Sequence, residues 1–129
     1  MAFGTLKADT LTHSTAGSLA TNYVVQGSAK AYLFSKDATP SAQGVSLNIS
    51  SIADSATGNF QITLTAAMSD SNPTVNVSQY QNQALGNALV YNSTQTLSST
   101  NIPVATYNGS SAAADYTNGV ATVVHGKLA

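Results

Sequence analysis

Residues 45–68 read VSLNISSIADSATGNFQITLTAAM, and two runs of alternating apolar and polar side chains dominate this stretch. Apolar residues recur at every second position over 45–49 and again over 60–64, and a polar segment with Asp54 and Gly58 separates the two runs. A period of two places alternate side chains on opposite faces of a β-strand. The stretch therefore predicts a β-hairpin with one apolar face and one polar face, the unit of a one-sided antiparallel sheet.

The apolar face of this hairpin is expected to supply much of the core. Its members are Val45, Leu47, Ile49, Phe60, Ile62 and Leu64. The polar face carries hydroxyl and amide side chains, at Ser46, Asn48, Gln61, Thr63 and Thr65. Because exposed polar side chains contribute little to stability, we expect Asn48, Gln61 and Thr63 to tolerate substitution.

Further strand signals follow one another at short spacing along the chain. They cover residues 23–34, 74–80, 87–92, 102–108 and 119–126, with turn residues between them. The first of these, YVVQGSAKAYLF, is expected to form one strand broken near Gly27 or two short strands. Helix signals are poor. Six to eight short strands of this kind predict an all-β domain over residues 23–129, either an antiparallel β-sandwich or a small barrel.

Residues 1–22 differ from the rest of the chain. They are rich in Thr, Ser, Ala and Gly, with isolated leucines at Leu6, Leu11 and Leu19 and no sustained period. Such a segment cannot bury three leucines by folding on itself. We expect a disordered segment or an extended N-terminal arm that lays these leucines against a neighbour, which makes them candidate attachment residues.

The composition favours assembly over binding to charged partners. Only 7% of the 129 residues are charged, against about 25% in an ordinary soluble protein, and the net charge is −1. A low charge promotes association, so we expect a homo-oligomer. A weak net charge gives no reason to bind nucleic acid. No apolar run reaches the ~18 residues that membrane insertion requires.

Chemistry-bearing residues are few and scattered. The chain has no cysteine and only two histidines, His13 and His125. Asp54 and Asp115 stand at positions where an aspartate caps its own turn. No spacing selects a pair of carboxylates for acid–base catalysis, and no nucleophile or phosphate-binding motif occurs. We therefore predict a protein without catalytic activity, cofactor or metal site.

Tyrosines beside amides are the best candidates for contact with a partner. They occur in the loop regions 79–95 and 107–118, with the candidate residues Tyr80, Asn82, Tyr91, Asn92, Tyr107 and Tyr116. An aromatic ring can stack on the apolar face of a saccharide or protein while neighbouring amides bind its polar groups. The alternative is that these rings close the ends of the sandwich.

Two segments of the chain resemble one known module. The motif S-x-N-x-S-S-I-x-D-x-x-T-G-x-[FY]-x-[VI]-x-[FL]-x-x-A-M-x-D matches residues 46–70, and ADYTNGVATVVHG matches a closing strand with Asp115 and Gly126 in place. The matching residues of the first segment are Ser46, Asn48, Ser50, Ser51, Ile52, Asp54, Thr57, Gly58, Phe60, Ile62, Leu64, Ala67, Met68 and Asp70. Together with the preceding SAKAYLF, they resemble the module of bacteriophage tail fibres and related virion proteins over residues 28–127. The N-terminal GTLKADTLTH is similar, over a shorter length, to segments by which many phage fibres begin.

The resemblance implies a structural protein of a virion. A short tail fibre or spike subunit is expected, attached by residues 1–22 and contacting a host-surface saccharide or protein. A capsid decoration protein and a tail adaptor or plug protein are the alternatives, both without catalysis. Fibre proteins of this kind generally form trimers, and the strand with Val75 and Val77 would then face the neighbouring copies.

Overall fold

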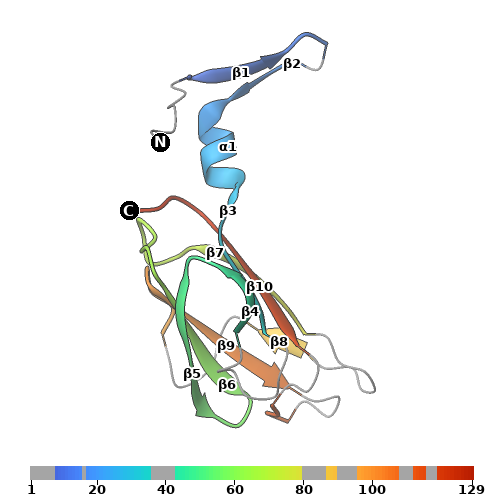
Figure 1. Ribbon diagram of the computed structural model, residues 1–129, viewed down its shortest axis with the longest axis vertical. Helices are drawn as coiled ribbons and strands as arrows, with labels where there is room; N and C mark the ends of the chain where they lie inside the picture. The colour runs from blue at the N-terminus through green and yellow to red at the C-terminus, as the bar shows by residue number, and fades with distance from the viewer. Residues whose placement is uncertain are drawn as a thin grey trace.

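Two four-stranded antiparallel sheets face each other in this chain (Figure 1). The computed structural model describes residues 8–15, 17–35, 43–79, 87–89, 96–107, 112–115 and 119–129. The first sheet has the order β4 (Gln43–Leu47), β3 (Ala29–Ser35), β10 (Val120–His125) and β7 (Thr74–Gln79). The second has the order β5 (Ile49–Ala56), β6 (Asn59–Leu64), β9 (Asn101–Tyr107) and β8 (Asn87–Leu89). The predicted all-β sandwich is confirmed, and neither sheet closes into a barrel.

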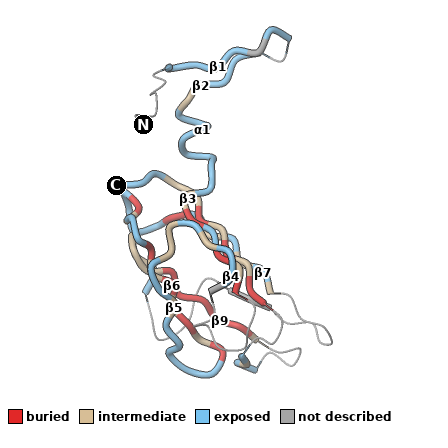
Figure 2. The backbone as a smooth tube through the Cα atoms, viewed as in Figure 1, coloured by how far each residue is buried: buried red, intermediate tan, exposed pale blue. Residues whose placement is uncertain are grey.

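The core lies between the inner faces of the two sheets (Figure 2). Strand β10 runs between β3 and β7, and every second residue from Val120 to Val124 is buried. Strand β6 shows the same alternation and buries Phe60, Ile62 and Leu64. Since β6 follows the period of two that its sequence shows, the predicted core is confirmed for these three residues.

The start of the predicted hairpin, residues 45–47, belongs to the other sheet, whereas the residues from Ile49 onward pair with β6 as predicted. Asn48 has a positive φ of 56°, which ends β4 and sends the chain across the sandwich into β5. Leu47 pairs with Tyr32 of β3, whereas Ile52 pairs with Ile62 of β6. Ile49 packs partly buried against the core, but Val45 is 69% exposed and Leu47 is 47% exposed. The prediction that Val45 and Leu47 line the core was therefore wrong.

Asn48 is a structural clamp at this crossing. Its side-chain Oδ1 accepts a hydrogen bond from the Ala66 amide at 2.7 Å, and its Nδ2 donates to the Ala66 carbonyl at 3.2 Å. The backbone carbonyl of Asn48 accepts from the Thr65 amide at 3.1 Å. The expectation that Asn48 tolerates substitution as a member of a polar face does not fit this arrangement.

The β5–β6 hairpin turns at Thr57 and Gly58, and Asp54 lies within β5 opposite Phe60. The sequence suggested that Asp54 lies in the loop of the hairpin, but the structure places it within β5. The carboxylate of Asp115 accepts a hydrogen bond from the Gly58 amide at 2.7 Å. Asp115 thus caps the turn of a distant hairpin instead of its own turn, because the end of β9 and the segment after it fold back over Gly58.

A second close approach joins the segment after β6 to the C-terminal segment. Met68 is 3% exposed and forms an isolated bridge with Leu128. Gly126 has a φ of 146°, and a Cβ at this position would lie 2.8 Å from the Met68 Cε. The backbone conformation favours glycine here, and the methyl group of Met68 packs against it.

The N-terminal part of the described chain leaves the sandwich as a hairpin and a helix (Figure 1). Strands β1 (Thr10–His13) and β2 (Gly17–Ala20) pair in an antiparallel hairpin, and α1 (Thr21–Gly27) connects them to β3. The prediction of a strand starting at Tyr23 was wrong, since residues 21–27 are helical. A short apolar run such as Tyr23–Val25 does not by itself distinguish a strand from a helix.

Candidate functional site

The arm, defined as β1, β2 and α1, projects from one end of the sandwich and is exposed along almost its whole length (Figures 1 and 2). Leu11 and Leu19 lie directly opposite each other in the β1–β2 register. They are 43% and 46% exposed. Of the three predicted attachment leucines, the structure thus brings two together on one face of the hairpin, and Leu6 lies outside the described residues.

Helix α1 contains no buried residue. Three consecutive large apolar residues, Tyr23, Val24 and Val25, are 66%, 41% and 54% exposed. The helix has no side-chain N-cap, and no acidic residue in its first turn or basic residue in its last turn. A seven-residue helix with β-branched residues and no cap gains little stability on its own. The arm therefore has the properties of a segment that packs against a partner.

Tyr23, Val24 and Val25 were missed as candidate attachment residues in the sequence analysis. The predicted boundary at residue 22 assigned them to a strand of the domain, where such residues would be buried. The signal that could have identified them is their position next to Gly27, which separates them from the regular alternation of β3.

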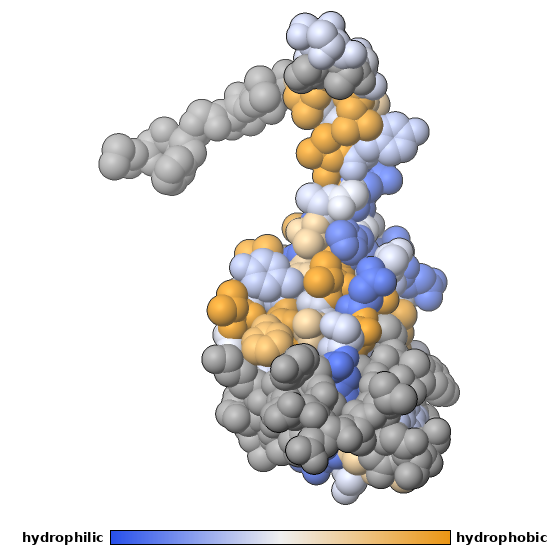
Figure 3. Space-filling model, turned by 90° about the vertical axis from the view of Figure 1, so that its right-hand side faces the viewer, coloured by the Kyte–Doolittle hydropathy of each residue, from blue (hydrophilic) through white to orange (hydrophobic). Residues whose placement is uncertain are grey.

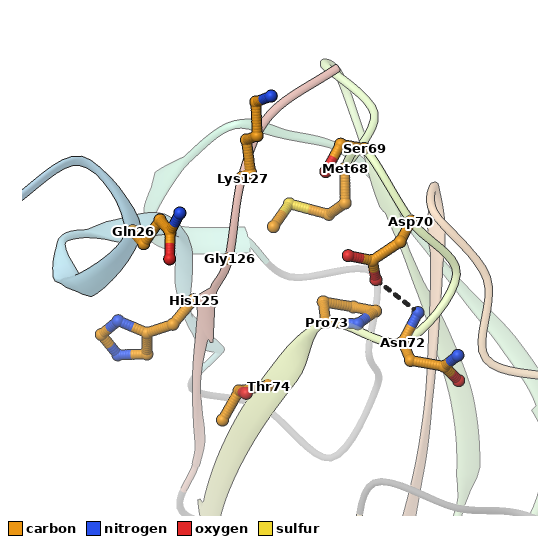
Figure 4. A pocket seen from close by; sticks show the side chains of 10 residues that line it. All are labelled: Gln26, Met68, Ser69, Asp70, Asn72, Pro73, Thr74, His125, Gly126 and Lys127. Atoms are coloured by element: carbon orange, nitrogen blue, oxygen red, sulfur yellow. Dashed lines mark hydrogen bonds between the residues drawn. The ribbon is translucent and has the colours of Figure 1, made fainter. Parts of the chain in front are cut away.

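A polar cleft of about 350 Å³ lies where the arm meets the sandwich (Figure 4). Gln26 contributes from α1, whereas the other lining residues come from the segments 68–74 and 125–127. Asp70 accepts a hydrogen bond from the Asn72 amide at 2.8 Å and so holds the turn that forms one wall. Asp70 gives the cleft a negative charge and Lys127 a positive one. The cleft therefore offers polar groups without a strong preference for cations or anions.

His125 joins the sandwich to the arm. Its Nδ1 lies 3.0 Å from the carbonyl oxygen of Gly27, at the end of α1. Because a carbonyl oxygen only accepts, Nδ1 is the donor in this hydrogen bond. His125 is thus used as a connection between arm and sandwich.

Of the predicted contact residues, the structure describes Tyr107, which lies at the end of the sandwich opposite the arm. In the first sheet, Ala29, Thr74 and His125 lie at the arm end, and Ser35, Gln79 and Val120 lie at the far end. Tyr107 ends β9 beside Asn87 and Ala113, and it is half-buried. The other predicted contact residues, Tyr80, Asn82, Tyr91, Asn92 and Tyr116, lie outside the described residues.

In the strand predicted to meet neighbouring copies, β7, the two valines point inward. Val75 and Val77 pack partly buried against the core, opposite Val124 and Thr122 of β10. The outward positions of β7 carry Thr74, Asn76 and Ser78, and a contact of this strand with neighbouring copies stays a prediction.

Within the described ranges, no three His, Cys, Asp or Glu residues group together in a way that could hold a metal ion. Across the same residues, no helix is both long and apolar enough to span a membrane.

Comparisons with protein families, with curated proteins and with solved structures found no match to this chain.

Proposed function

We propose that this chain is a non-enzymatic structural protein of a bacteriophage particle, a short tail fibre or spike subunit attached by its arm. The observation that carries the proposal is the arm, which leaves the sandwich and exposes Leu11, Leu19 and the Tyr23–Val25 segment. A lone copy of the protein gains nothing from holding these side chains in water. Attachment to a partner surface removes them from water.

The position of the arm suggests how the molecule is oriented on the particle. The arm leaves from the end of the sandwich where β3 begins, and Tyr107 lies at the other end. An arm held by the particle directs the Tyr107 end outward. This is the end at which a fibre or spike subunit would meet a host surface, through many weak contacts multiplied by the number of copies.

The resemblance of residues 28–127 to phage fibre modules supports the same proposal. The motif residues Gly58 and Asp115 hold each other in place across the fold, and so do Met68 and Gly126. They form a scaffold and carry no catalytic chemistry. A scaffold of this kind suits a protein that acts by position and by binding.

Incorporation into particles tests the proposal. Phage that lack the gene would be complemented with the wild-type chain or with a Leu11→Ser, Leu19→Ser variant, and the copies per purified particle counted by immunoblot. We expect the variant to lose about tenfold or more of its incorporation, which corresponds to about 1.4 kcal/mol of attachment free energy. Its β-rich circular dichroism should stay unchanged.

The matched control is Leu128→Ser, because Leu128 is 38% exposed but lies outside the arm. This control should incorporate like the wild type. Absence of the wild-type chain from purified particles would refute the proposed function. Full incorporation of the arm variant would refute the role of the arm in attachment.

A further inference from the structure

The polar cleft at the junction of arm and sandwich has walls that hydrogen bonds hold in place. His125 donates to the Gly27 carbonyl at 3.0 Å and so fixes the position of Gln26, the preceding residue, at one side of the cleft. The Ser69 amide donates to the Lys127 carbonyl at 2.7 Å, and this bond joins the two other lining segments. The cleft is therefore largely formed before a ligand enters, as small-molecule sites usually are.

The floor of the cleft is apolar and its rim is polar. Met68 is 3% exposed, Pro73 is buried as well, and both line the cleft. Figure 4 shows the Met68 side chain with Gln26 on one side and Asp70 on the other. The exposed polar side chains that line the cleft are Gln26, Ser69, Asp70, Asn72, Thr74 and Lys127. A ligand thus meets carbon and sulfur atoms below it and hydrogen-bonding groups around its edge.

The rim mixes hydrogen-bond donors with acceptors. The side-chain amides of Gln26 and Asn72 offer both, as does the Thr74 hydroxyl, whereas the Asp70 carboxylate only accepts and the Lys127 ammonium group only donates. Because these two charges have opposite signs, an ion of either sign meets a like charge in the cleft. A hydroxyl group donates and accepts, so it can bond to every one of these side chains.

The volume of the cleft limits the size of the ligand. It is about 350 Å³, near the lower end of the range of roughly 300–1,000 Å³ that small-molecule sites occupy. A single sugar ring has C–H groups on its faces and hydroxyl groups around its edge, which matches the apolar floor and the polar rim. An extended peptide would instead need a longer groove or a free strand edge.

We propose that this cleft binds a small uncharged polyol, of which one monosaccharide unit is the size that fits. Its C–H face packs on Met68, and its hydroxyl groups bond to Gln26 and Asn72. Since Gln26 belongs to α1 and Asn72 to the segment before β7, the ligand also connects the arm to the sandwich. A ligand that contacts both parts favours the conformation in which the arm lies against the sandwich.

The cleft differs from the surface that the arm offers to the particle. Figure 3 shows apolar side chains along the helix and hydrophilic ones gathered below it, where the chain enters the sandwich. The cleft also lies at the arm end of the molecule, away from Tyr107 at the other end. Binding of a polyol here is therefore independent of attachment to a particle and of contact with a host.

An NMR titration of the full chain locates the ligand, because 129 residues are few enough for assigned amide spectra. The probes are the methyl glycosides of glucose, galactose, mannose and N-acetylglucosamine, with inorganic phosphate as the anion and tetramethylammonium as the cation for comparison. We expect at least one glycoside to shift the amide signals of Gln26, Asn72 and Lys127 with a millimolar Kd. The two ions should leave these signals unchanged.

Two pairs of variants give matched controls. Gln26→Ala and Asn72→Ala each remove one exposed amide from the rim, and each should raise the Kd at least about fivefold, the effect of one hydrogen bond. Asn22→Ala in α1 and Asn76→Ala in β7 each remove an exposed amide outside the cleft, and they should leave the Kd unchanged.

Absence of shifts with all four glycosides would overturn the cleft as a polyol site. Equal shifts with phosphate or tetramethylammonium would overturn the uncharged class of ligand. An unchanged Kd in Gln26→Ala would remove the arm from the site, and an unchanged Kd in both cleft variants would overturn the location.

If methyl glucoside binds, dextran identifies the source of the sugar. Dextran that shifts the same signals would show that the unit belongs to a polysaccharide, and shifts with the glycoside alone would identify a free sugar. Both results support the cleft. The proposed function is decided separately, by the presence of the wild-type chain on purified particles.

Discussion

At the scale of single residues, four positions connect parts of the chain that are far apart in sequence. Asp115 caps the turn at Gly58, and Gly126 makes room for Met68. All four residues belong to the fibre-type motif, but a motif match does not say which residues meet. The period of two in β6 predicted three core residues because burial on one face determines that pattern. The partner of Asp115 depends on tertiary packing, which no local pattern contains.

Gly58 has no room for a side chain, and this leads to a prediction for its substitution. A Cβ at Gly58 would lie 2.6 Å from both the Ala114 amide nitrogen and the Thr106 carbonyl oxygen, at a φ of 69°. Gly58→Ala is therefore expected to lower the free energy of unfolding by roughly 3 kcal/mol or more. Chemical denaturation of the purified variant measures this change.

Gly27→Ala is the control for this variant, because a Cβ at Gly27 meets nothing within 4 Å. We expect it to leave the stability of the sandwich unchanged. Asp115→Ala removes the cap alone and should cost about 1–3 kcal/mol, since the Gly58 amide loses its partner. A Gly58→Ala protein as stable as the wild type would contradict the close packing of this turn.

At the scale of elements, the largest difference from the sequence-based prediction is the division of one predicted strand into β4 and β5. The alternation over 45–49 is real, but Asn48 places its two ends in different sheets. The pattern cannot reveal this, because a residue in the left-handed conformation interrupts a strand without changing the spacing of apolar side chains. Helix α1 was missed for a similar reason, since its short apolar run fits either structure.

The crossing at Asn48 gives a second prediction. Asn48→Ala removes two side-chain hydrogen bonds to Ala66. It also places alanine, which has no side-chain amide, in the left-handed conformation at φ 56°. We expect a loss of about 2–3 kcal/mol in the free energy of unfolding. Asn48→Gly, which accepts the backbone conformation, should lose less, and the difference isolates the conformational part.

Gln61→Thr serves as the comparison for the Asn48 variants, because Gln61 lies on the outward side of β6. Its change in stability should stay within about 0.5 kcal/mol. Equal stability of Asn48→Ala and Gln61→Thr would show that the clamp contributes nothing.

The arm as an element gives a third prediction. No residue of α1 is buried, and His125 donates a hydrogen bond to Gly27 at the junction. Deletion of residues 1–27 should therefore cost only about 1 kcal/mol, the net contribution of an ordinary hydrogen bond. Thermal unfolding followed by circular dichroism should show a β-rich protein with a midpoint a few degrees below that of the full chain. An unfolded product would mean that the arm belongs to the core.

Over the whole molecule, the exposed large apolar side chains of the described residues are unevenly distributed. They gather on the arm and at Tyr32, Val45 and Leu47 of strands β3 and β4, whereas the outward side of β7 is polar. The low charge visible in the sequence predicts association but does not locate it. Location requires the fold, because Val45 and Leu47 have the pattern of core residues in the sequence and are exposed in the structure.

An image reconstruction of the intact phage particle by electron cryo-microscopy would show directly where the proposed subunit sits and what its arm contacts. We expect copies of the sandwich grouped about an axis, with each arm buried in the particle and the Tyr107 end directed outward. Copies spread over the capsid surface would change the assignment from a fibre or spike to a decoration protein and keep the role of the arm. Sandwiches embedded in the particle with their arms free in solvent, or a particle without this protein, would contradict the claim.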